Sequence, residues 1–493
     1  MTTGLVLAID QGTTNTKALA VRSDGTIVAQ ASKAMHVHYP QPGWAEQSPL
    51  DIWGSVREVI AKVVGEIGEP IAAVAISNQR ETILLWDAET GRPIGPAVIW
   101  QCRRSADRCA HLRAAGHADE INERTGLALD PLFPAAKIAW LLDELPAARA
   151  EATAGKLRVG TVDSWLLWNL TGGKVHATDH SNASRTQLFN TATLSWDKRL
   201  AELFDVPLNL LPTVLPSDSR FGEVAEGATA LPGGTPIHAM MGDSHAALFG
   251  HGVRVPGTVK ATYGTGSSLM TLTAERVSSS HGLSGTIAWS TSAGVAYALE
   301  GNISVSGQAA AFMADMLNLP DAEALSALAY TVDNSNGVAF VPALVGMGAP
   351  HWRDDARGTI TGLSLGTRPA HLARAALEAI AFQVTDVFSA MEDDIGSPMS
   401  QLRADGGASR NDFLMQFQAD LINRPVVTSR APEVSALGAA AMAFTGLGAA
   451  VPIVPGATRF EPSMSPDERS DSRARWRSAV SRTLHTPINS TAN

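Results

Sequence analysis

Two similar units open the two halves of this chain, and each consists of an apolar strand, a loop rich in glycine and threonine, and a second strand. In the first unit the apolar run Leu5–Ile9 leads into the loop Asp10–Lys17. In the second unit Thr258–Thr262 leads into the loop Tyr263–Ser268 and then into Leu269–Thr273. A unit that recurs in this way predicts two domains built on one plan.

The length and the pattern of the chain agree with this organisation. At 493 residues the chain is too long for one ordinary domain, so we expect domains at 1–250 and 251–493. Strand and helix signals alternate along both halves, which predicts α/β layers. Further strands are expected at 26–31, 72–77, 83–86 and 97–100, and helices at 49–67, 135–145, 371–391, from Asn411 onward and after Ser465.

The composition excludes several classes of protein. With 45% hydrophobic and 17% charged residues it is typical of a soluble globular protein, and the net charge of −10 argues against non-specific binding to nucleic acid or anionic membranes. The N-terminus lacks the basic region of a signal peptide, and no apolar run approaches the ~18–20 residues of a membrane helix. A cytoplasmic protein is therefore expected. Cys102 and Cys109 are expected on one helix face as reduced thiols.

The first loop has the composition of a phosphate-binding turn. Gly12 permits close approach of the backbone, and Thr13 and Thr14 offer amides and hydroxyls to phosphate oxygens. Asp10, at the end of the strand, can hold Mg²⁺ through water. The Walker A pattern occurs nowhere in the chain. An ordinary β-turn is the alternative for either loop alone, and the pairing of the two loops favours phosphate binding.

Three polar clusters elsewhere have side chains suited to chemistry. The glycine-rich turn before Asn411 could admit a flat adenine, with Asn411 capping the next helix and touching the base. Arg80 and Glu81 supply a donor fork and an acceptor suited to vicinal hydroxyls. Asp243 can accept the proton of a hydroxyl that attacks a phosphate. The clusters thus predict an adenine site, an alcohol site and a group that accepts the proton of the alcohol.

Each cluster also has a competing interpretation. Asn411 alone suggests an ordinary helix start, and Arg80 with Glu81 suggests a surface ion pair. The sequence Gly242–Ala246 resembles the nucleophile elbow of a hydrolase, with Ser244 as nucleophile. None of the 13 histidines has an aspartate three residues before it, which argues against an esterase of that type. Trp100 is more often a core residue, although its position after a strand allows it to wall a polyol pocket.

Taken together, these motifs resemble the FGGY family of carbohydrate kinases, most closely its glycerol kinase branch. The similarity runs over nearly the whole chain, and several independent motifs fall in the correct order and spacing. They are DQGTT at 10–14, PGWAEQSP at 42–49, SNQRET at 77–82, WQCRR at 100–104, DHSNASRTQLFN at 179–190, GDSHAALFG at 242–250, TYGTG at 262–266, GMGAPHW at 346–352 and DGGASRNDFLMQFQ at 405–418, and the run 358–378 fits the C-terminal signature of the family.

The resemblance implies an α/β fold of two actin-like domains of RNase H-type topology, with the active site in the cleft between them. It implies a kinase that uses ATP and Mg²⁺ to phosphorylate a small polyol or sugar, without nucleic-acid binding or membrane insertion. A homodimer or homotetramer is left open. The implied nucleotide-binding residues are Thr13, Thr14, Thr265, Gly307, Gly407 and Asn411; Arg80, Glu81, Trp100, Asp243 and Ser244 would bind the alcohol, Asp243 would be the catalytic base, and Asp10 and Asp243 would hold the metal.

Three departures from the glycerol kinase pattern affect the alcohol side. That branch carries tyrosine at Leu132, glutamine at Ser244 and an aromatic residue at Ser268. Each substitution removes volume, so we expect a roomier site for a four- or five-carbon polyol, although water could fill the space and leave glycerol as the substrate. Ala311 replaces a glutamine near the nucleotide, and the loop 232–237 lacks the arginine that binds a sugar-bisphosphate inhibitor in some relatives, so that feedback is not expected.

Two further functions stay open on the sequence. One is phosphorylation of a ketose or aldose, such as a pentulose, as in other branches of the family. The other is an actin-like ATP-binding switch with no small-molecule acceptor. The alcohol-binding cluster and Asp243 argue against a switch, because a switch needs no grip on an alcohol.

Overall fold

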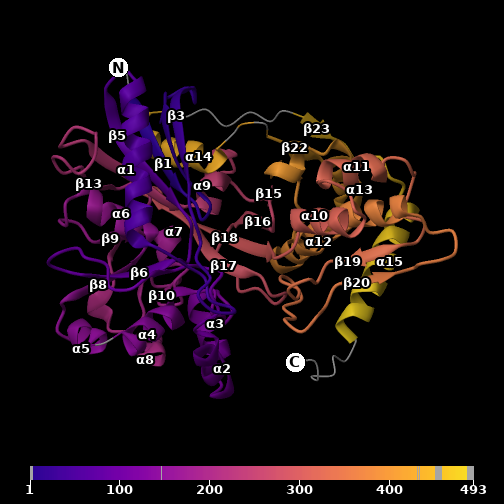
Figure 1. Cartoon of the computed structure of the whole chain (residues 1–493), viewed down its shortest axis with the longest axis horizontal. Coiled ribbons are helices and arrows are strands. Elements are labelled where there is room, and N and C mark those ends of the chain that lie inside the picture. Colours follow the sequence, from indigo (N-terminus) through magenta and orange to yellow (C-terminus); the bar gives the residue numbers. More distant parts are fainter. Residues whose placement is uncertain (1–3, 146, 430, 432, 450–457, 486–493) are drawn as a thin grey trace.

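The computed structural model describes residues 4–145, 147–429, 431, 433–449 and 458–485, which form two lobes side by side (Figure 1). The first lobe is built on a mixed sheet of six strands. In sheet order these are β13 (Arg220–Glu223), β14 (Pro236–Gly242), β5 (Ile71–Asn78), β1 (Leu5–Gln11), β2 (Asn15–Val21) and β3 (Ile27–Ala34). β1 pairs antiparallel with β2 and parallel with β5. The loop between β1 and β2 therefore lies at one end of the central strands of the sheet.

The second lobe repeats this plan in a sheet of seven strands. In sheet order these are β17 (Ser284–Thr291), β18 (Gly294–Ile303), β16 (Ser267–Thr273), β15 (Thr258–Tyr263), β21 (Gln401–Asp405), β22 (Val426–Thr428) and β23 (Thr458–Phe460). The run β18-β16-β15-β21-β22 has the same order and directions as β3-β2-β1-β5-β14. The two predicted units are thus equivalent central hairpins, and the expected pair of RNase H-type domains is confirmed.

Smaller sheets and most of the shorter helices extend the first lobe. A four-stranded sheet runs β4 (Glu46–Gln47), β7 (Ala97–Val98), β6 (Ile83–Asp87), β8 (Leu157–Thr161). Short pairs join β10 (Phe189–Asn190) to β11 (Ser195–Trp196), and β12 (Thr213–Leu215) to β9 (Ala177–Asp179). The helices are α1 (Pro49–Glu66), α2 (Ala106–Ala114), α3 (Ala118–Thr125), α4 (Pro134–Glu144), α5 (Ala148–Thr153), α6 (Val162–Leu170), α7 (His180–Ala183), α8 (Lys198–Phe204) and α9 (Asp243–Gly250), with a 3₁₀ turn at Leu208–Leu210.

The second half of the chain has fewer and longer helices. They are α10 (Gly307–Met316), α11 (Ala322–Ala329), α12 (Pro369–Ile395), α13 (Asp412–Ile422), α14 (Val434–Gly446) and α15 (Pro466–His485), with a 3₁₀ turn at Gly407–Arg410 and a strand pair β19 (Ala339–Val341) and β20 (Thr359–Thr361). In the described part of the chain, no helix combines the length and the apolar character needed to cross a membrane.

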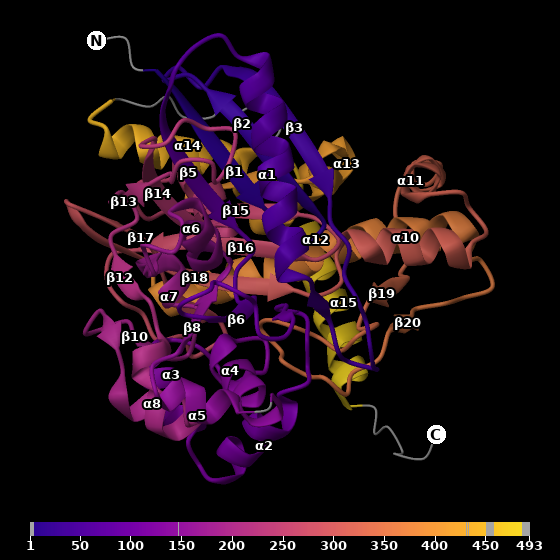
Figure 2. The ribbon, with the colours of Figure 1, turned by 60° about the vertical axis from the view of Figure 1, so that its left-hand side comes forward.

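Helix α1 shows how local sequence fixes these elements. Ser48 caps it by accepting a hydrogen bond from the amide of Asp51 at 3.2 Å, and Pro49 occupies the first turn, where its missing N–H costs nothing. A stripe that includes Ile52 and Val59 is buried against the first sheet. Figure 2 shows α1 in front of this sheet and α14 behind it.

Helix α14 belongs to the second half of the chain but packs on the first sheet. Ala436 and Phe444 share a core with Val6 and Ala75 of β1 and β5. α14 also crosses α9 with almost no space between the backbones, because a Cβ at Gly438 would collide with the carbonyl oxygen of Ala246. The division into 1–250 and 251–493 stays a prediction. Helix α14 holds the two parts together through its packing on the first sheet and on α9.

The cysteine expectation was wrong in part. Cys109 lies in α2, but Cys102 precedes that helix, so the two do not share a helix face. Both are buried free thiols. The expected strand at 97–100 is shorter, at Ala97–Val98. The surface helix expected after Ser465 is α15, and its frayed end would fall outside the described residues.

Candidate functional site

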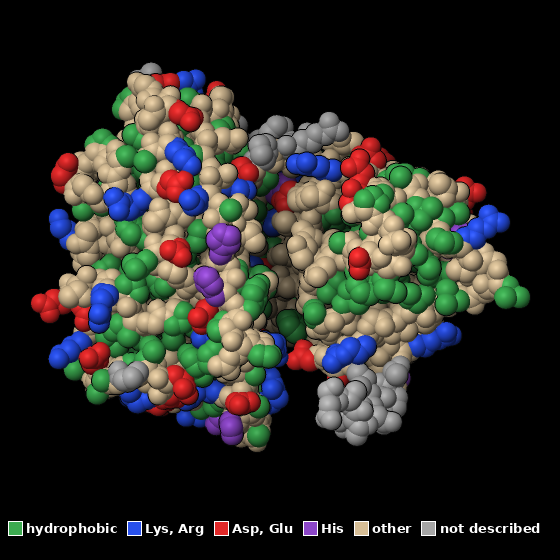
Figure 3. Space-filling view, in the orientation of Figure 1, with side chains coloured by type: hydrophobic (Ala, Val, Ile, Leu, Met, Phe, Trp, Pro, Cys, Tyr) green, Lys and Arg blue, Asp and Glu red, His purple; other side chains and the backbone are tan. Residues whose placement is uncertain are grey.

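A deep cleft separates the two lobes, and Figure 3 shows it as a hollow between them. It encloses about 770 Å³ and is lined by both lobes. Parallel strands β1, β5 and β14 end side by side, so that Asp10 pairs with Ser77 and Gly242 with Asn78 in register. The cleft lining includes Asp10, Lys17, Asp243 and Ser244 from the first half, and Lys260, Asp405, Gly406, Gly407, Arg410 and Glu433 from the second.

Two carboxylates of the cleft have raised pKa values. Burial raises the pKa of Asp10 to about 7, with a further contribution from the negative charge of Asp243, while a 2.7 Å hydrogen bond from the Ser77 hydroxyl opposes the shift. Burial also raises the pKa of Asp243, although 37% of its side chain faces the cleft, and the Arg80 guanidinium opposes this. Two acidic groups that repel each other on one wall of a cleft suit a shared cation.

The raised pKa of Asp10 has a measurable consequence for stability. Between about pH 4 and about pH 7, folded Asp10 keeps a proton that the unfolded chain has released. The free energy of unfolding should therefore fall as pH rises through this window and be independent of Asp10 above it. Urea unfolding should show this slope in the wild type and a smaller slope in Asp10→Asn; equal slopes would contradict the assigned pKa.

The two predicted phosphate loops are equivalent hairpin tips. The amide of Gly12 donates to the carbonyl of Asn15 at 2.9 Å, and the amide of Gly264 donates to that of Gly266 at 2.9 Å. Thr14 and Thr265 are exposed at the tips. These tips therefore present a backbone and hydroxyl groups, as a phosphate site requires.

The remaining loop residues have partners within the protein. The Thr13 hydroxyl accepts from the Trp100 indole at 3.0 Å and donates to Gln79 at 3.1 Å. Gly307 begins α10, and its amide donates to the carbonyl of Gly264 at 2.9 Å. A Cβ at Gly307 would lie 2.6 Å from that oxygen, which explains the glycine. Thr13 thus connects the first loop to Trp100.

The turn after β21 forms part of the cleft wall. Gly406 has a φ of 90° and a Cβ there would lie 2.5 Å from the carbonyl of Tyr263, whereas Gly407 faces open space. Asn411 caps α13 as expected, accepting from the amide of Leu414 at 2.9 Å and from the Tyr330 hydroxyl at 2.8 Å. Its side chain amide is therefore largely engaged by the protein, whereas Gly406, Gly407, Ser409 and Arg410 of this turn line the cleft.

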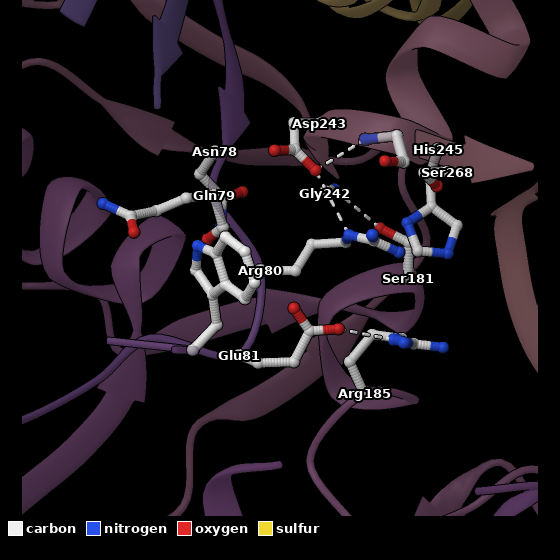
Figure 4. Close-up of polar contacts among 12 residues, drawn as sticks. Asn78, Gln79, Arg80, Glu81, Ser181, Arg185, Gly242, Asp243, His245 and Ser268 are labelled. Carbon is white, nitrogen blue, oxygen red and sulfur yellow. Dashed lines mark hydrogen bonds and ion pairs between the residues drawn. The ribbon is translucent and has the colours of Figure 1, made fainter. Parts of the chain in front are cut away.

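The cluster of Arg80 and Glu81 lies next to Asp243 (Figure 4). Arg80 Nε donates to Asp243 Oδ1 at 3.1 Å, and the amide of Ser244 donates to the same oxygen at 2.6 Å. Arg80 and Glu81 are buried, at 8% and 5% exposure, so the surface ion pair interpretation is wrong. Glu81 has a φ of 61°, a strained conformation that is typical of functional sites.

The three departures also fall around this cluster. Leu132 is half-buried beside Glu81, because the Lys137 ammonium donates to both carbonyls, at 2.6 Å and 3.1 Å. Ser244 lines the cleft beside Asp243. The Ser268 hydroxyl donates to Glu300 at 3.1 Å. Ala311 is exposed on α10, away from this cluster.

Several residues of the site were missed in the sequence. Lys260 lines the cleft although it is only 1% exposed, and burial lowers its pKa. Lys17 of the first half forms an ion pair at 2.5 Å with Glu433 of the second half. Glu300 forms an ion pair with Arg80, and Arg185 forms one with Glu81. A charge inside an apolar strand is the signal that could have identified Glu300, since such a charge is rarely buried without a partner.

The geometry also limits two alternative chemistries. Within the described residues, no three or more His, Cys, Asp or Glu side chains gather to hold a metal, so a cation between Asp10 and Asp243 would need water or ligand oxygens. In the same part of the chain no histidine forms a hydrogen bond with the Ser244 hydroxyl, whereas a serine nucleophile needs such a base. The hydrolase interpretation therefore lacks its essential contact.

Known proteins resemble this chain over its whole length. Models of the FGGY family of carbohydrate kinases match it at residues 5–250 for the N-terminal domain and 259–447 for the C-terminal domain. A glycerol kinase of Symbiobacterium thermophilum and an apulose kinase of Pectobacterium atrosepticum are each 46% identical to it, covering 98% of this chain and 99% of their own. A solved glycerol kinase of Plasmodium falciparum with ADP has a TM-score of 0.93 at 32% identity, covering 98% of this chain and 99% of its own.

Proposed function

Since the chain belongs to the FGGY family of carbohydrate kinases, we propose that it transfers the γ-phosphoryl group of ATP to a hydroxyl of a small polyol in the cleft. It is an ATP-dependent kinase of the glycerol kinase type. The observation that carries the assignment of the site is the position of Asp243, which lines the cleft and is bonded to Arg80 of the buried cluster. A base must lie within hydrogen-bond reach of the attacking hydroxyl, and the place of Asp243 in the cleft beside Arg80 supports this role.

In this proposal the two parts of the chain have different tasks. Residues 1–250 bind the acceptor through Arg80, Glu81, Trp100 and Ser244, and residues 251–493 bind the nucleotide. The turn at Gly406 and Gly407, where a Cβ at Gly406 would meet backbone and Gly407 faces open space, supports a flat base or sugar at that wall. Thr13, Thr14, Thr265, Gly307 and Asn411 complete the proposed nucleotide site. The volume of about 770 Å³ is of the size that small-molecule sites have.

Asp243 is the proposed catalytic base. Its raised pKa makes the carboxylate a better proton acceptor, while the Arg80 guanidinium orients it and opposes the rise of its pKa. The mutually repelling carboxylates Asp10 and Asp243 fit Mg²⁺, which when bound would neutralise charge on the phosphates. Closure of the lobes would exclude water, which competes with the alcohol as acceptor.

The acceptor is proposed to be larger than glycerol. Leu132, Ser244 and Ser268 are smaller than the side chains of the glycerol kinase pattern and lie around the buried cluster. A hydrophobic or polar wall that loses volume admits additional carbons with little penalty. A ketose is the second candidate, because the apulose kinase relative is as similar to this chain as the glycerol kinase is.

A coupled assay of ADP release across glycerol, tetritols, pentitols and ketopentoses tests the function and the acceptor together. We expect at least one four- or five-carbon acceptor to exceed glycerol about tenfold in kcat/KM. A Leu132→Tyr, Ser244→Gln, Ser268→Phe triple variant should reverse this preference. Strong preference of the wild type for glycerol would refute the enlarged pocket, and ATP hydrolysis that no acceptor stimulates would favour a switch.

A further inference from the structure

Behind the proposed acceptor site, five charged side chains alternate in sign along one continuous chain of contacts. Asp243 contacts Arg80 at 3.1 Å, and Arg80 contacts Glu300 at 2.7 Å. Glu300 contacts Arg185 at 2.8 Å, and Arg185 contacts Glu81 at 2.7 Å. Figure 4 shows Arg80 and Glu81 between Asp243 and Arg185. Of these five residues Asp243 lines the cleft, whereas Arg80, Glu81 and the two innermost members, Glu300 and Arg185, lie behind its lining.

The inner members are among the most buried charges of the protein. The Glu300 side chain is 0% exposed and that of Arg185 is 1% exposed. Burial acts to raise the pKa of Glu300, yet Arg185 and Arg80 hold it well below its usual range, so Glu300 is an anion. One buried carboxylate therefore divides its two oxygens between two arginines, Oε1 to Arg80 and Oε2 to Arg185.

The contacts of Glu300 connect the lobes. It lies on β18 of the second sheet, whereas Arg80, Glu81 and Arg185 belong to the first half of the chain. The hairpin β17–β18 is docked on the first lobe, where the Ser184 and Thr286 hydroxyls lie 2.9 Å apart. The carboxylate thus reaches the acceptor-binding pair from the opposite half of the molecule.

The network holds Glu81 against backbone strain. Its φ of 61° is unfavourable for a residue with a side chain, and such a conformation persists only where neighbours fix it. Arg185 fixes the Glu81 carboxylate, and the Lys137 ammonium fixes its carbonyl at 3.1 Å. Arg80 Nη1 and Arg185 Nη1 are buried and have no hydrogen-bond partner among the described residues, so the arrangement is not optimised for stability alone.

We infer that Glu300 and Arg185 are positioning residues for the acceptor: together they set the reach and angle of Arg80 and Glu81 and, through Arg80, of the Asp243 carboxylate. This inference rests on the proposed kinase function. Neither residue touches the acceptor. Glu300 and Arg185 affect the affinity for the acceptor alcohol. Their loss therefore changes acceptor binding more than ATP binding.

Glu300→Gln tests this, because it keeps the shape of the side chain and removes its charge. The two buried arginines then repel each other because the negative charge between them is gone, and Arg80 moves. We expect the acceptor KM to rise about tenfold or more while the dissociation constant of ATP, measured by calorimetry, changes less than about twofold. In the Glu300→Gln, Arg185→Met double variant, stability should recover but the acceptor KM should stay high.

Glu378→Gln is the matched control. Glu378 is a buried carboxylate of the second lobe that pairs with Arg374 at 3.1 Å, on α12 and outside the network. It should lower the melting temperature and leave the acceptor KM unchanged. An equal rise in acceptor KM in both variants would overturn the inference, as would a folded Glu300→Gln with wild-type KM.

If Glu300→Gln does not fold, Glu300→Asp is the second test, because it keeps the charge but shortens its reach. It should also raise the acceptor KM, and a wild-type KM in this variant would overturn the inference too. A wild type that phosphorylates no polyol or ketose would instead refute the proposed function.

Discussion

An Asp243→Asn variant is expected to lose about a thousandfold in kcat for acceptor phosphorylation while its affinity for ATP stays close to that of the wild type. Asparagine has the shape of aspartate but cannot take up a proton, and it gives Arg80 Nε no charged partner. Because burial raises the pKa of Asp243, wild-type kcat should also fall on the acid side as this carboxylate becomes protonated. The residual activity of the variant should lack this acid limb.

Single-turnover kinetics and ATP calorimetry on the same preparation separate chemistry from binding. Asp163→Asn is a suitable control, since burial also raises the pKa of Asp163, to about 7, but this fully buried residue lies on α6 and does not line the cleft. Its kcat should change little. A turnover of Asp243→Asn near that of the wild type would show that another group accepts the proton.

A Gly438→Ala variant is expected to be about 3 kcal/mol less stable to unfolding, because one methyl group cannot fit between α14 and α9. The added Cβ would collide with the Ala246 carbonyl, and on the facing side a Cβ at Gly250 would lie 2.6 Å from the Val434 carbonyl. Backbone atoms cannot rotate away as a side chain does. The helices must separate, which opens the core shared by the two lobes.

Gly54→Ala is the control for this substitution. Gly54 lies inside α1, and no atom lies within 4 Å of the position its Cβ would take. The same change should there raise the free energy of unfolding by about 0.5–1 kcal/mol, since alanine is the better helix former. Denaturant unfolding of both variants measures the difference; a stable Gly438→Ala would mean that the crossing of α9 and α14 is looser than described.

Local sequence was sufficient for the central elements of the fold. Leu5–Ile9 is an apolar run next to a glycine loop, and it lies within β1. The stripe along 371–391 predicts the buried face of α12. Cys102 was misplaced because its spacing of seven from Cys109 fits a helix, whereas the segment that contains Cys102 forms a turn before the helix begins. Periodicity gives no information on where such a helix begins.

The site was predictable where its residues follow strands in short motifs. Asp10, Asp243 and Arg80 each stand at or just beyond the end of an apolar strand, and parallel strands bring such ends together. Glu300 and Arg185 are different, since they are far apart in sequence and their meeting depends on the docking of β17–β18. Lys260 is similar. The sequence shows that a charge lies within the strand β15, but it does not show that this charge borders the cleft.

Helix α14 also determines when the first lobe can finish folding during synthesis. One face of its sheet, which includes Val6, Ala75 and Met241, is covered by a helix that the ribosome makes only after nearly the whole second sheet. Until then a growing chain carries an uncovered apolar surface, the kind of surface that chaperones bind and that promotes aggregation. For the same reason a fragment that ends near residue 250 would be an incomplete lobe, and the two halves of this molecule mature together.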